Sequence, residues 1–386
     1  MEIFIVLAIT YIFSILLGKL LERIKIPWIF SALFLGLVFS FLNISWLNET
    51  LSSDSFTFLG NLGMYFMLFI IGLELDLEKM SSLGRFILFS MLFIILFDVL
   101  LGTFIISSFG YPLIISLVAA FSFATVGEAV LVPILEEFKL LKKKLGTTIL
   151  GIGIFDDMIE VFTIVLASFL IGIHSNTLNL ELISISLAAL FLLTYFLLKY
   201  GKIRKSKSRI PKIEDLFIFS VFLLFLFIAI GRYCDAEALG ALLAGVSLKN
   251  FIPKKIFEDV EEDIKVLSYG FFGPIFFLWV GSSVNLKSIY LSPLLTISIF
   301  FVSIFAKLFA SIISGYKYFG IRNSILLGTG LSVRFSTGLV ISQLLFTKQI
   351  IDQFLFSALV SASALSTVLV PIVFSLLLHK WKKYIQ

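Results

Sequence analysis

Long apolar runs recur along the whole chain, and they constrain its fold more than any other feature. A run of about 17 to 25 apolar residues is long enough to cross a bilayer as a helix. About thirteen such runs follow one another, over residues 2–21, 27–43, 56–75, 84–108, 111–137, 145–172, 178–200, 214–231, 236–250, 267–283, 290–315, 322–346 and 351–378. With 59% hydrophobic and only 14% charged residues, the chain is predicted to be an all-α, multi-pass integral membrane protein.

Lysine and arginine gather in alternate loops, and this sets the expected orientation. One set of loops contains Arg23, Lys25, Lys79, Arg85, Lys139, Lys142, Lys143, Lys144, the run from Lys202 to Lys212, Lys249, Lys254, Lys255, Lys317, Arg322, Lys380, Lys382 and Lys383. The intervening loops contain only Arg232, Lys287 and Lys348. By the positive-inside rule we expect the N-terminus outside and the C-terminus in the cytoplasm.

The basic pI of about 9.1 follows from these loops, so it does not indicate a nucleic-acid partner. The single cysteine, Cys234, excludes an internal disulfide and a cysteine-based metal site. The first apolar run lacks a basic start and a small-residue cleavage site, so we expect it to remain as a span. No soluble domain and no cofactor are predicted, and the bilayer is the expected partner throughout.

Two adjacent aspartates, Asp156 and Asp157, lie inside the apolar run 145–172, and Glu160 follows on a similar helix face. An acidic residue at the centre of a membrane helix costs roughly 2.5 to 3.5 kcal/mol on insertion scales. A solvated loop is the alternative explanation, but it would divide an otherwise good span. The acids are therefore predicted to form a functional site near the midplane.

Two cations fall at a similar depth in other spans. Lys307 lies roughly 17 residues into one span and Arg334 about 12 residues into the next, at 1.5 Å per residue. A buried cation without an anion is far costlier than a paired one, so we expect pairing, with the aspartates as first choice for Lys307. The alternatives are that Lys307 snorkels to an interface and that Arg334 is a structural brace.

Glycine and proline interrupt two spans in corresponding parts of the chain. One reads ATVGEAVLVP around Gly127 and Glu128, and the other reads GTGLSVRFSTG around Arg334. Such interruptions predict discontinuous helices around a midplane site of a secondary transporter, in two inverted repeats. The expected repeats are residues 1–172 and 214–386, joined by a linker helix and cytoplasmic loop over 173–213, within a single transporter domain of 1–386.

Several stretches together resemble the cation:proton antiporter-2 family of Kef-type and NapA-like exchangers. Residues 62–80 read LGMYFMLFIIGLELDLEKM, residues 269–286 read YGFFGPIFFLWVGSSVNL and residues 238–248 read ALGALLAGVSL, each similar to a family stretch. Asp156 and Asp157 match the family's aspartate pair, and Lys307 matches the lysine of its electrogenic members. The resemblance implies a homodimer in a prokaryotic inner membrane, with a moving core formed by the fourth to sixth and eleventh to thirteenth spans.

Two departures from the family pattern concern charge. Thr125 is followed by Val126, Gly127 and Glu128 where the family has Thr-Ser, and Arg334 is followed by Phe335 and Ser336 where the family has Gly-Glu. One acid is lost and another gained on the facing broken helix. We therefore predict that Glu128 pairs with Arg334.

The expected function is exchange of a monovalent cation, sodium first, for protons by alternating access. Oxygen ligands suit hard cations, so Asp157, Asp156 and the hydroxyl of Thr125 are the predicted alkali-cation and proton site, with Lys307 beside it. Glu128, Arg334 and Glu160 form the predicted supporting charges.

In the family pattern Lys307 pairs with Asp156 and releases a proton as the ion enters, which implies an electrogenic cycle. The charge placement leaves open whether sodium, lithium or potassium is the exchanged ion. The alternatives are a potassium:proton antiporter or potassium efflux protein, a channel, and a non-transporting sensor or scaffold. An enzyme is not expected, because adjacent aspartates cannot supply two acids on different helices.

Overall fold

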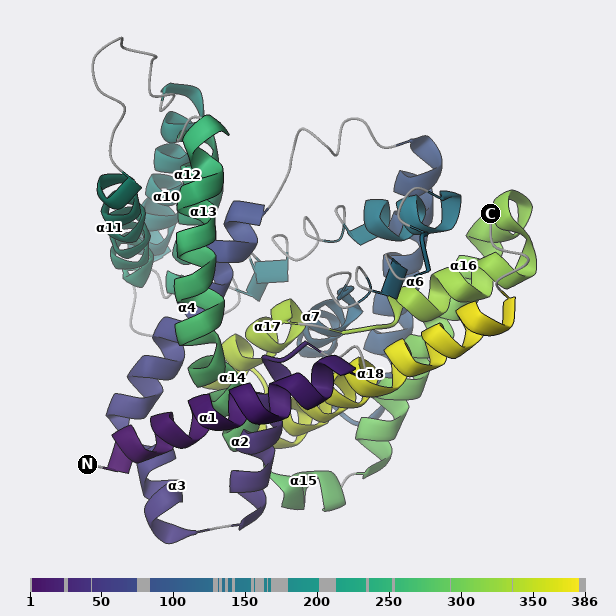
Figure 1. The fold of residues 1–386 in the computed structure, drawn as a ribbon, viewed down its shortest axis with the longest axis horizontal. Coiled ribbons are helices and arrows are strands. Elements are labelled where there is room, and N and C mark those ends of the chain that lie inside the picture. The colour runs from purple at the N-terminus through teal and green to yellow at the C-terminus, as the bar shows by residue number, and fades with distance from the viewer. Residues whose placement is uncertain are drawn as a thin grey trace.

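The chain folds into a bundle of helices (Figure 1). The structure, a computed structural model, describes residues 2–23, 27–42, 44–74, 84–127, 131, 134–135, 138–140, 143–153, 156, 163–164, 166–167, 180–200, 213–233, 236–251, 254–291, 293–334 and 336–381. Its elements are α1 (Glu2–Arg23), α2 (Phe30–Leu42), α3 (Ser45–Leu51), α4 (Asp54–Glu74), α6 (Arg85–Ser108), α7 (Leu113–Ala124), α10 (Leu180–Tyr200), α11 (Ile213–Arg232), α12 (Glu237–Phe251), α13 (Lys254–Lys265), the π-helix η1 (Val266–Phe272), α14 (Gly273–Ser283), α15 (Leu286–Leu291), α16 (Pro293–Leu331), α17 (Ser336–Thr347) and α18 (Gln353–Trp381).

The all-α, multi-pass membrane class is confirmed. Within the described ranges no strand occurs, and seven helices there are long and apolar enough to cross a membrane. Shorter apolar helices, such as α2 and α7, accompany them. The count of thirteen spans remains a prediction, because parts of several predicted spans, above all 111–137 and 145–172, lie outside the described residues.

The observed helices follow the predicted spans closely, with one difference. The eleventh and twelfth predicted spans lie on either side of Gly320, where a φ of 73° interrupts α16 and separates two helices. The loop expected over residues 249–265 is largely helical, because α13 covers Lys254–Lys265, and η1 follows it within the predicted span 267–283. Pro274 lies in the first turn of α14 and has no amide hydrogen for an i→i−4 bond, which accounts for the wider π-type winding immediately before it.

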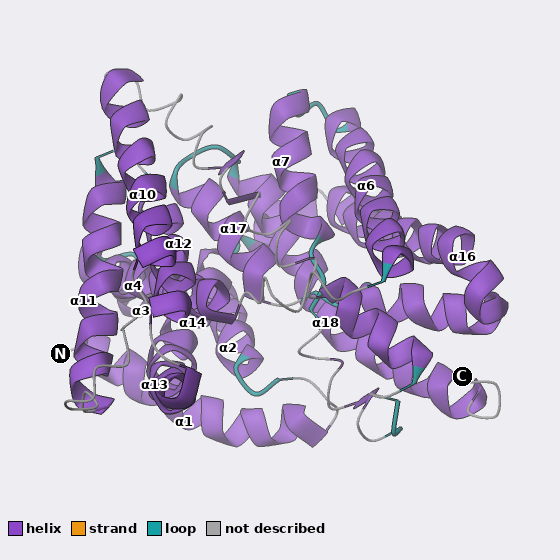
Figure 2. Cartoon of the chain, turned by 90° about the horizontal axis from the view of Figure 1, so that it is seen from above, coloured by secondary structure: helices purple, strands orange, loops and turns teal. Residues whose placement is uncertain are grey.

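The helices pack in two groups. In the first, which we call the core group, α16 packs on α6 and α18, while α7 packs on α6 and α17. In the second, the frame group, α12 packs on α4, α11 and α10, and α14 packs on α2 and α4. Figure 2 shows α6, α7 and α16 on one side of the molecule and α10, α11 and α12 on the other. The described members of the core group come from the spans predicted for the moving core, and its movement stays a prediction.

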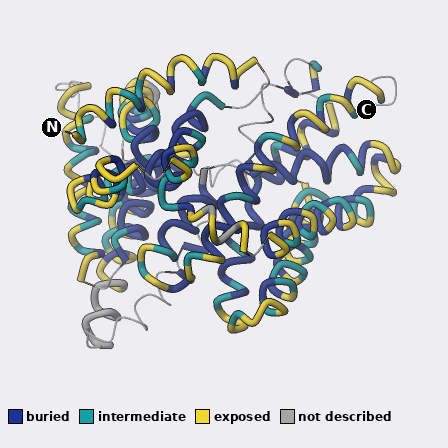
Figure 3. The backbone as a smooth tube through the Cα atoms, turned by 90° about the horizontal axis from the view of Figure 1, so that it is seen from below, coloured by how far each residue is buried: buried dark blue, intermediate teal, exposed yellow. Residues whose placement is uncertain are grey.

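The outer surface of both groups is rich in large apolar side chains. Phe89, Leu96 and Phe104 project from α6, and Phe301 and Phe305 from α16. Figure 3 shows exposed backbone around the periphery and buried backbone in the interior. Because lipid surrounds a membrane protein, this exposed apolar surface is the expected lipid-facing one.

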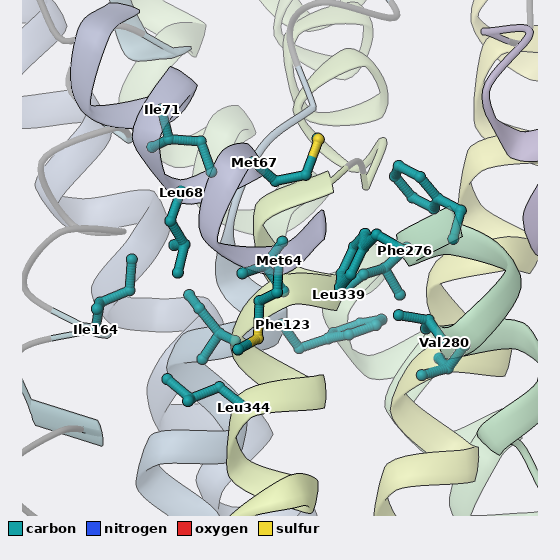
Figure 4. Packing of buried hydrophobic residues seen from close by; sticks show 14 of the residues in the cluster. Met64, Met67, Leu68, Ile71, Phe123, Ile164, Phe276, Val280, Leu339 and Leu344 are labelled. Carbon is teal, nitrogen blue, oxygen red and sulfur yellow. The ribbon is translucent and has the colours of Figure 1, made fainter. Parts of the chain in front are cut away.

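Apolar side chains fill the contact between the two groups. Figure 4 shows Met64 and Leu68 of α4 in one cluster with Phe123 of α7 and with Leu339 and Leu344 of α17. Apolar packing of this kind has no directional bonds to break when one surface moves over another. The contact is therefore suited to sliding.

Polar links between the two groups lie at one end of the bundle. Gln353 donates to the Ser283 carbonyl at 2.7 Å, and the Asn285 amide donates to Ser357 Oγ at 3.0 Å. Lys348 and Glu237 form an ion pair at 3.3 Å. By the charge distribution of the loops, this end is predicted to be the outer one.

Candidate ion-exchange site

Two broken helices cross inside the core group. Helix α7 ends at Ala124, and Thr125 continues in an extended conformation with ψ of 159°. Helix α16 ends at Leu331, and α17 begins only at Ser336. The Gly127 amide donates to the Val333 carbonyl at 3.0 Å and joins the two breaks. The predicted discontinuities are thus confirmed in the described parts of both spans.

Lys307 satisfies the backbone at these breaks. The side chain is fully buried, and its ammonium donates to the carbonyls of Ala124 at 2.7 Å, Thr125 at 3.1 Å and Leu331 at 2.9 Å. These are the C-terminal ends of α7 and α16, where the partial negative charge of a helix attracts a cation. The alternative that Lys307 snorkels to an interface is wrong.

Asp98 on α6 is the anion that faces Lys307. Its carboxylate lies 3.7 Å from the Lys307 ammonium and 3.1 Å from Arg334, and it accepts a hydrogen bond from Ser303 at 3.0 Å. Within the described residues the ion pair of Lys307 is with Asp98, and the expected pairing with Asp156 and Asp157 stays a prediction, since Asp157 lies outside those residues. Asp98 was missed from the sequence, although it is the lone acid within the predicted span 84–108 and meets the criterion that selected Asp156.

Arg334 ties the two breaks together. Its guanidinium donates to the Thr125 carbonyl, to Ser303 and to Asp98, and it lies over the Phe123 ring, 4.6 Å from the centroid. This geometry matches the structural-brace alternative. Its buried Nε has no hydrogen-bond partner within the described part of the chain, so the predicted pairing with Glu128 stays a prediction.

Helix α18 supports the second break from the other side. Thr367 donates to the Arg334 carbonyl at 2.6 Å, and Ser366 donates to the Ser332 carbonyl at 2.5 Å. These hydroxyls satisfy carbonyls that the interrupted helix leaves without amide partners. The backbone at the crossing is therefore fixed by side chains from several helices.

Asp156 lies beside the first break and is buried. One carboxylate oxygen accepts the Val126 amide at 2.5 Å, and the other, Oδ1, has no partner among the described residues. An unpaired buried carboxylate oxygen is costly unless a proton or a cation occupies it. Asp156 is thus suited chemically to hold either one.

Of the other predicted site residues, Thr125 is described by the structure and three acids are not. The Thr125 hydroxyl donates to the Ser122 carbonyl at 3.5 Å, and the Thr125 carbonyl is taken by Lys307 and Arg334. Asp157, Glu128 and Glu160 lie outside the described residues. The structure therefore brings together Asp156, Thr125, Lys307 and Arg334 and adds Asp98.

The pairing of Glu128 with Arg334 can be tested by a double-mutant cycle on the melting temperature of the purified protein. If the two side chains form a buried pair, Glu128→Gln and Arg334→Gln each lower the melting temperature, and the double variant costs little more than either one. Glu49→Gln, a change at an acid near the end of the short helix α3, is the matched control. Additive losses would show that Arg334 has no interaction with Glu128.

Interrupted helices that cross around buried charges, in a bundle of membrane-spanning helices, define the class of ion-coupled secondary transporters. Comparison with known proteins makes the class specific. The chain belongs to the sodium/hydrogen exchanger family, whose transmembrane model matches residues 8–380.

Proteins named as Na⁺/H⁺ antiporters are similar to this chain over nearly their full length. A probable Na⁺/H⁺ antiporter 3 from Methanocaldococcus jannaschii is 29% identical over 381 residues, covering 96% of this chain and 94% of that one. A Na⁺/H⁺ antiporter from Enterococcus hirae is 24% identical, with 97% of each chain covered. The Na⁺/H⁺-K⁺ antiporter GerN from Bacillus cereus is 22% identical over 383 residues, covering 96% and 95%.

The fold is also that of a solved antiporter. The structure of the sodium proton antiporter MjNhaP1 from M. jannaschii superposes with a TM-score of 0.67 at 16% identity, covering 97% of this chain and 98% of that one. The antiporter resemblance is thereby confirmed at the level of the family. The narrower assignment to the antiporter-2 group stays a prediction, because the matched family is broader and the matched structure carries a different subgroup name.

Proposed function

We propose that the protein exchanges Na⁺ for protons across the membrane at Asp156 and Asp157. The observation that carries the proposal is the buried Asp156 carboxylate, which has one oxygen on the Val126 amide and the other without a partner in the described residues. A proton and an alkali cation are stabilised by the same negative charge and cannot occupy it together. Competition for one carboxylate therefore couples the two ions.

The ligands proposed for the cation are oxygen atoms, as a hard ion requires. Asp157 is the proposed primary ligand, by resemblance to the family, with Asp156 and the Thr125 hydroxyl completing the shell. Glu160 is proposed to extend the path of the ion. With two carboxylates available, two protons can replace one Na⁺, and the cycle then moves net charge.

An electrogenic cycle of this kind responds to the membrane potential. Each net charge that crosses 100 mV is worth about 2.3 kcal/mol. A potential that is negative inside would then drive Na⁺ outward against its gradient. A potassium ion is the second candidate substrate, and the similarity to GerN, a protein described as a Na⁺/H⁺-K⁺ antiporter, favours testing it.

Alternating access is proposed to move the core group against the frame group. The apolar contact between α4 and α17 supports sliding, and the polar links at Gln353, Asn285 and Lys348 would close the outer end. The frame group is proposed to form a homodimer, which gives the moving core a fixed support. The proposed location is a prokaryotic inner membrane, with the N-terminus outside and the C-terminus in the cytoplasm.

Two inverted repeats, residues 1–172 and 214–386, are proposed to underlie this movement, and recurring contacts support them. A Cβ on Gly72 would overlap the Leu242 carbonyl, and a Cβ on Gly245 would overlap the Phe69 carbonyl. The same reciprocal contact joins Gly36 to Leu278 and Gly281 to Leu33.

These two crossings are related by one fixed separation in sequence. Gly36 and Gly245 are 209 positions apart, as are Gly72 and Gly281, and Thr125 and Arg334, which contact each other, have the same separation. A shared offset at three places is what a duplicated unit produces. It extends the repeat from hydropathy to individual residues.

The proposal is tested in proteoliposomes that hold a preformed pH gradient. Adding Na⁺, Li⁺ or K⁺ in turn should collapse the gradient, with Na⁺ effective at the lowest concentration. An imposed potential should change the rate. Currents too large for a carrier would indicate a channel, and no collapse with any ion by folded protein would favour a sensor or scaffold.

A further inference from the structure

Asp98 is a buried acid that the exchange proposal does not use. It lies on α6, is 3% exposed, and contacts two cations that come from α16 and from the segment after it, Lys307 and Arg334. The small cavity beside it has a volume of about 10 Å³ and is lined mainly by apolar residues. Such a volume admits at most one water molecule, so within the described part of the chain Asp98 faces no path for a hydrated ion.

We propose that Asp98 is a positioning residue that keeps Lys307 permanently charged across the two helix ends, so that Asp156 and Asp157 alone carry the exchanged protons. The proposal rests on the proposed exchange function and adds the division of labour within the site. It differs from the family pattern, in which the lysine pairs with the first aspartate and gives up a proton.

The hydrogen bonds of Lys307 support a lysine that stays protonated. An ammonium has three donors, and here all three go to carbonyls, at Ala124, Thr125 and Leu331. Loss of one proton would leave at least one of these buried carbonyls without its donor. It would also remove a cation from beside Asp98, which holds Lys307 in place without taking up any of those three donors.

The polar and charged groups that face Asp98 support its role as a fixed counter-charge. Among the described residues, α7 contributes only apolar side chains to the cavity next to Asp98, and the one polar side chain from α16 there is Ser303, which donates to Asp98. Lys307 faces Asp98 from the same helix without lining the cavity. Arg334 completes the group, and Asp156 lies across the Thr125–Val126 segment from it. Asp98 balances one of the two cations in every state of the cycle, whatever Asp156 binds.

The repeat gives an independent argument for the pair. Asp98 and Lys307 have the same separation of 209 positions as Thr125 and Arg334. Residues at equivalent positions meet only where a two-fold axis passes between them. The acid and the base thus lie on the proposed axis of the core group, between the two breaks, where both half-helices can be held at once.

The test measures the number of protons exchanged per Na⁺ from the reversal conditions of proteoliposomes. Lys307→Gln is expected to exchange more slowly but with the wild-type number of protons per Na⁺. A loss of one proton per Na⁺ in Lys307→Gln would overturn the proposal, because the lysine would then be a carrier.

A second set of variants tests Asp98 itself. Asp98→Asn leaves two cations facing Asp156 without the anion that balances one of them, so Na⁺ must compete with both. The Na⁺ concentration for half-maximal exchange should therefore rise roughly tenfold, which corresponds to about 1.4 kcal/mol. Asp98→Glu should stay near wild type. Asp98→Asn with Lys307→Gln restores the charge balance and should bring the Na⁺ requirement back down.

The same variants separate a positioning role from a merely structural one. If Asp98 only stabilised the fold, Asp98→Asn would lower the melting temperature while leaving the Na⁺ requirement unchanged, and the second substitution would not rescue it. If Asp98→Asn does not fold, the melting temperatures of Lys307→Gln and of the double variant decide the pairing, since a double variant that also fails to fold contradicts it. Absence of exchange by wild-type protein would reject the proposed function alone, because the melting measurements still report on the pair.

Discussion

Asp157→Asn protein is expected to fold and to carry no exchange, whereas Asp156→Asn protein is expected to exchange Na⁺ with one proton fewer per ion. An asparagine at position 156 can still accept the Val126 amide through its carbonyl oxygen. Its amide nitrogen then takes the position of Oδ1, the oxygen that has no partner among the described residues. That nitrogen can neither ligate a cation nor bind a proton at neutral pH. Asp157, the proposed primary ligand, is left as the only carboxylate of the pair.

The measurement is the collapse of a pH gradient by Na⁺, followed by determination of the protons exchanged per Na⁺. Asp54→Asn is the matched control, because Asp54 is an exposed acid at the start of α4. This control should exchange as wild type does. Sustained exchange by Asp157→Asn, or an unchanged stoichiometry in Asp156→Asn, would remove these residues from their proposed roles.

The span pattern of the fold could be predicted because membrane helices are selected by length and apolarity alone. The predicted run 84–108 and the observed α6 differ by one residue at the start. The helical character of α13 could not be predicted this way, because its many charges remove it from any count of apolar runs. Its helix is instead stabilised by pairs such as Lys265 with Glu261, one turn apart at 2.8 Å.

The composition of the site was largely predictable, but its pairing was not. Depth along each span indicated that Lys307 and Arg334 lie level with Asp156, and the structure places all three around Thr125 and Val126. Depth does not reveal which face of a helix meets which neighbour. The pairing of Lys307 with Asp98 depends on the crossing of α6 and α16, which hydropathy cannot supply.

Alanine at the two glycine crossings is expected to destabilise the protein strongly and about equally. At Gly72 and Gly245 between α4 and α12, and at Gly36 and Gly281 between α2 and α14, an added Cβ would overlap a carbonyl oxygen of the facing helix. A backbone atom cannot rotate out of the way as a side chain can, so the helices must separate. Such overpacking typically costs about 1–3 kcal/mol, and close approach of helices through small residues is what holds membrane bundles together.

The melting temperature of the detergent-purified protein measures this effect, with Gly84→Ala as the control, because nothing lies within 4 Å of a Cβ at Gly84. Variants that melt like Gly84→Ala would show that the helices are not in close contact. The comparison between crossings tests the repeat. In the proposed repeats Gly72 and Gly281 occupy equivalent positions, and each meets the residue three before and the residue one after the facing glycine. Equivalent contacts in a duplicated unit should give similar losses for Gly72→Ala and Gly281→Ala, and sensitivity at only one crossing would contradict the repeat.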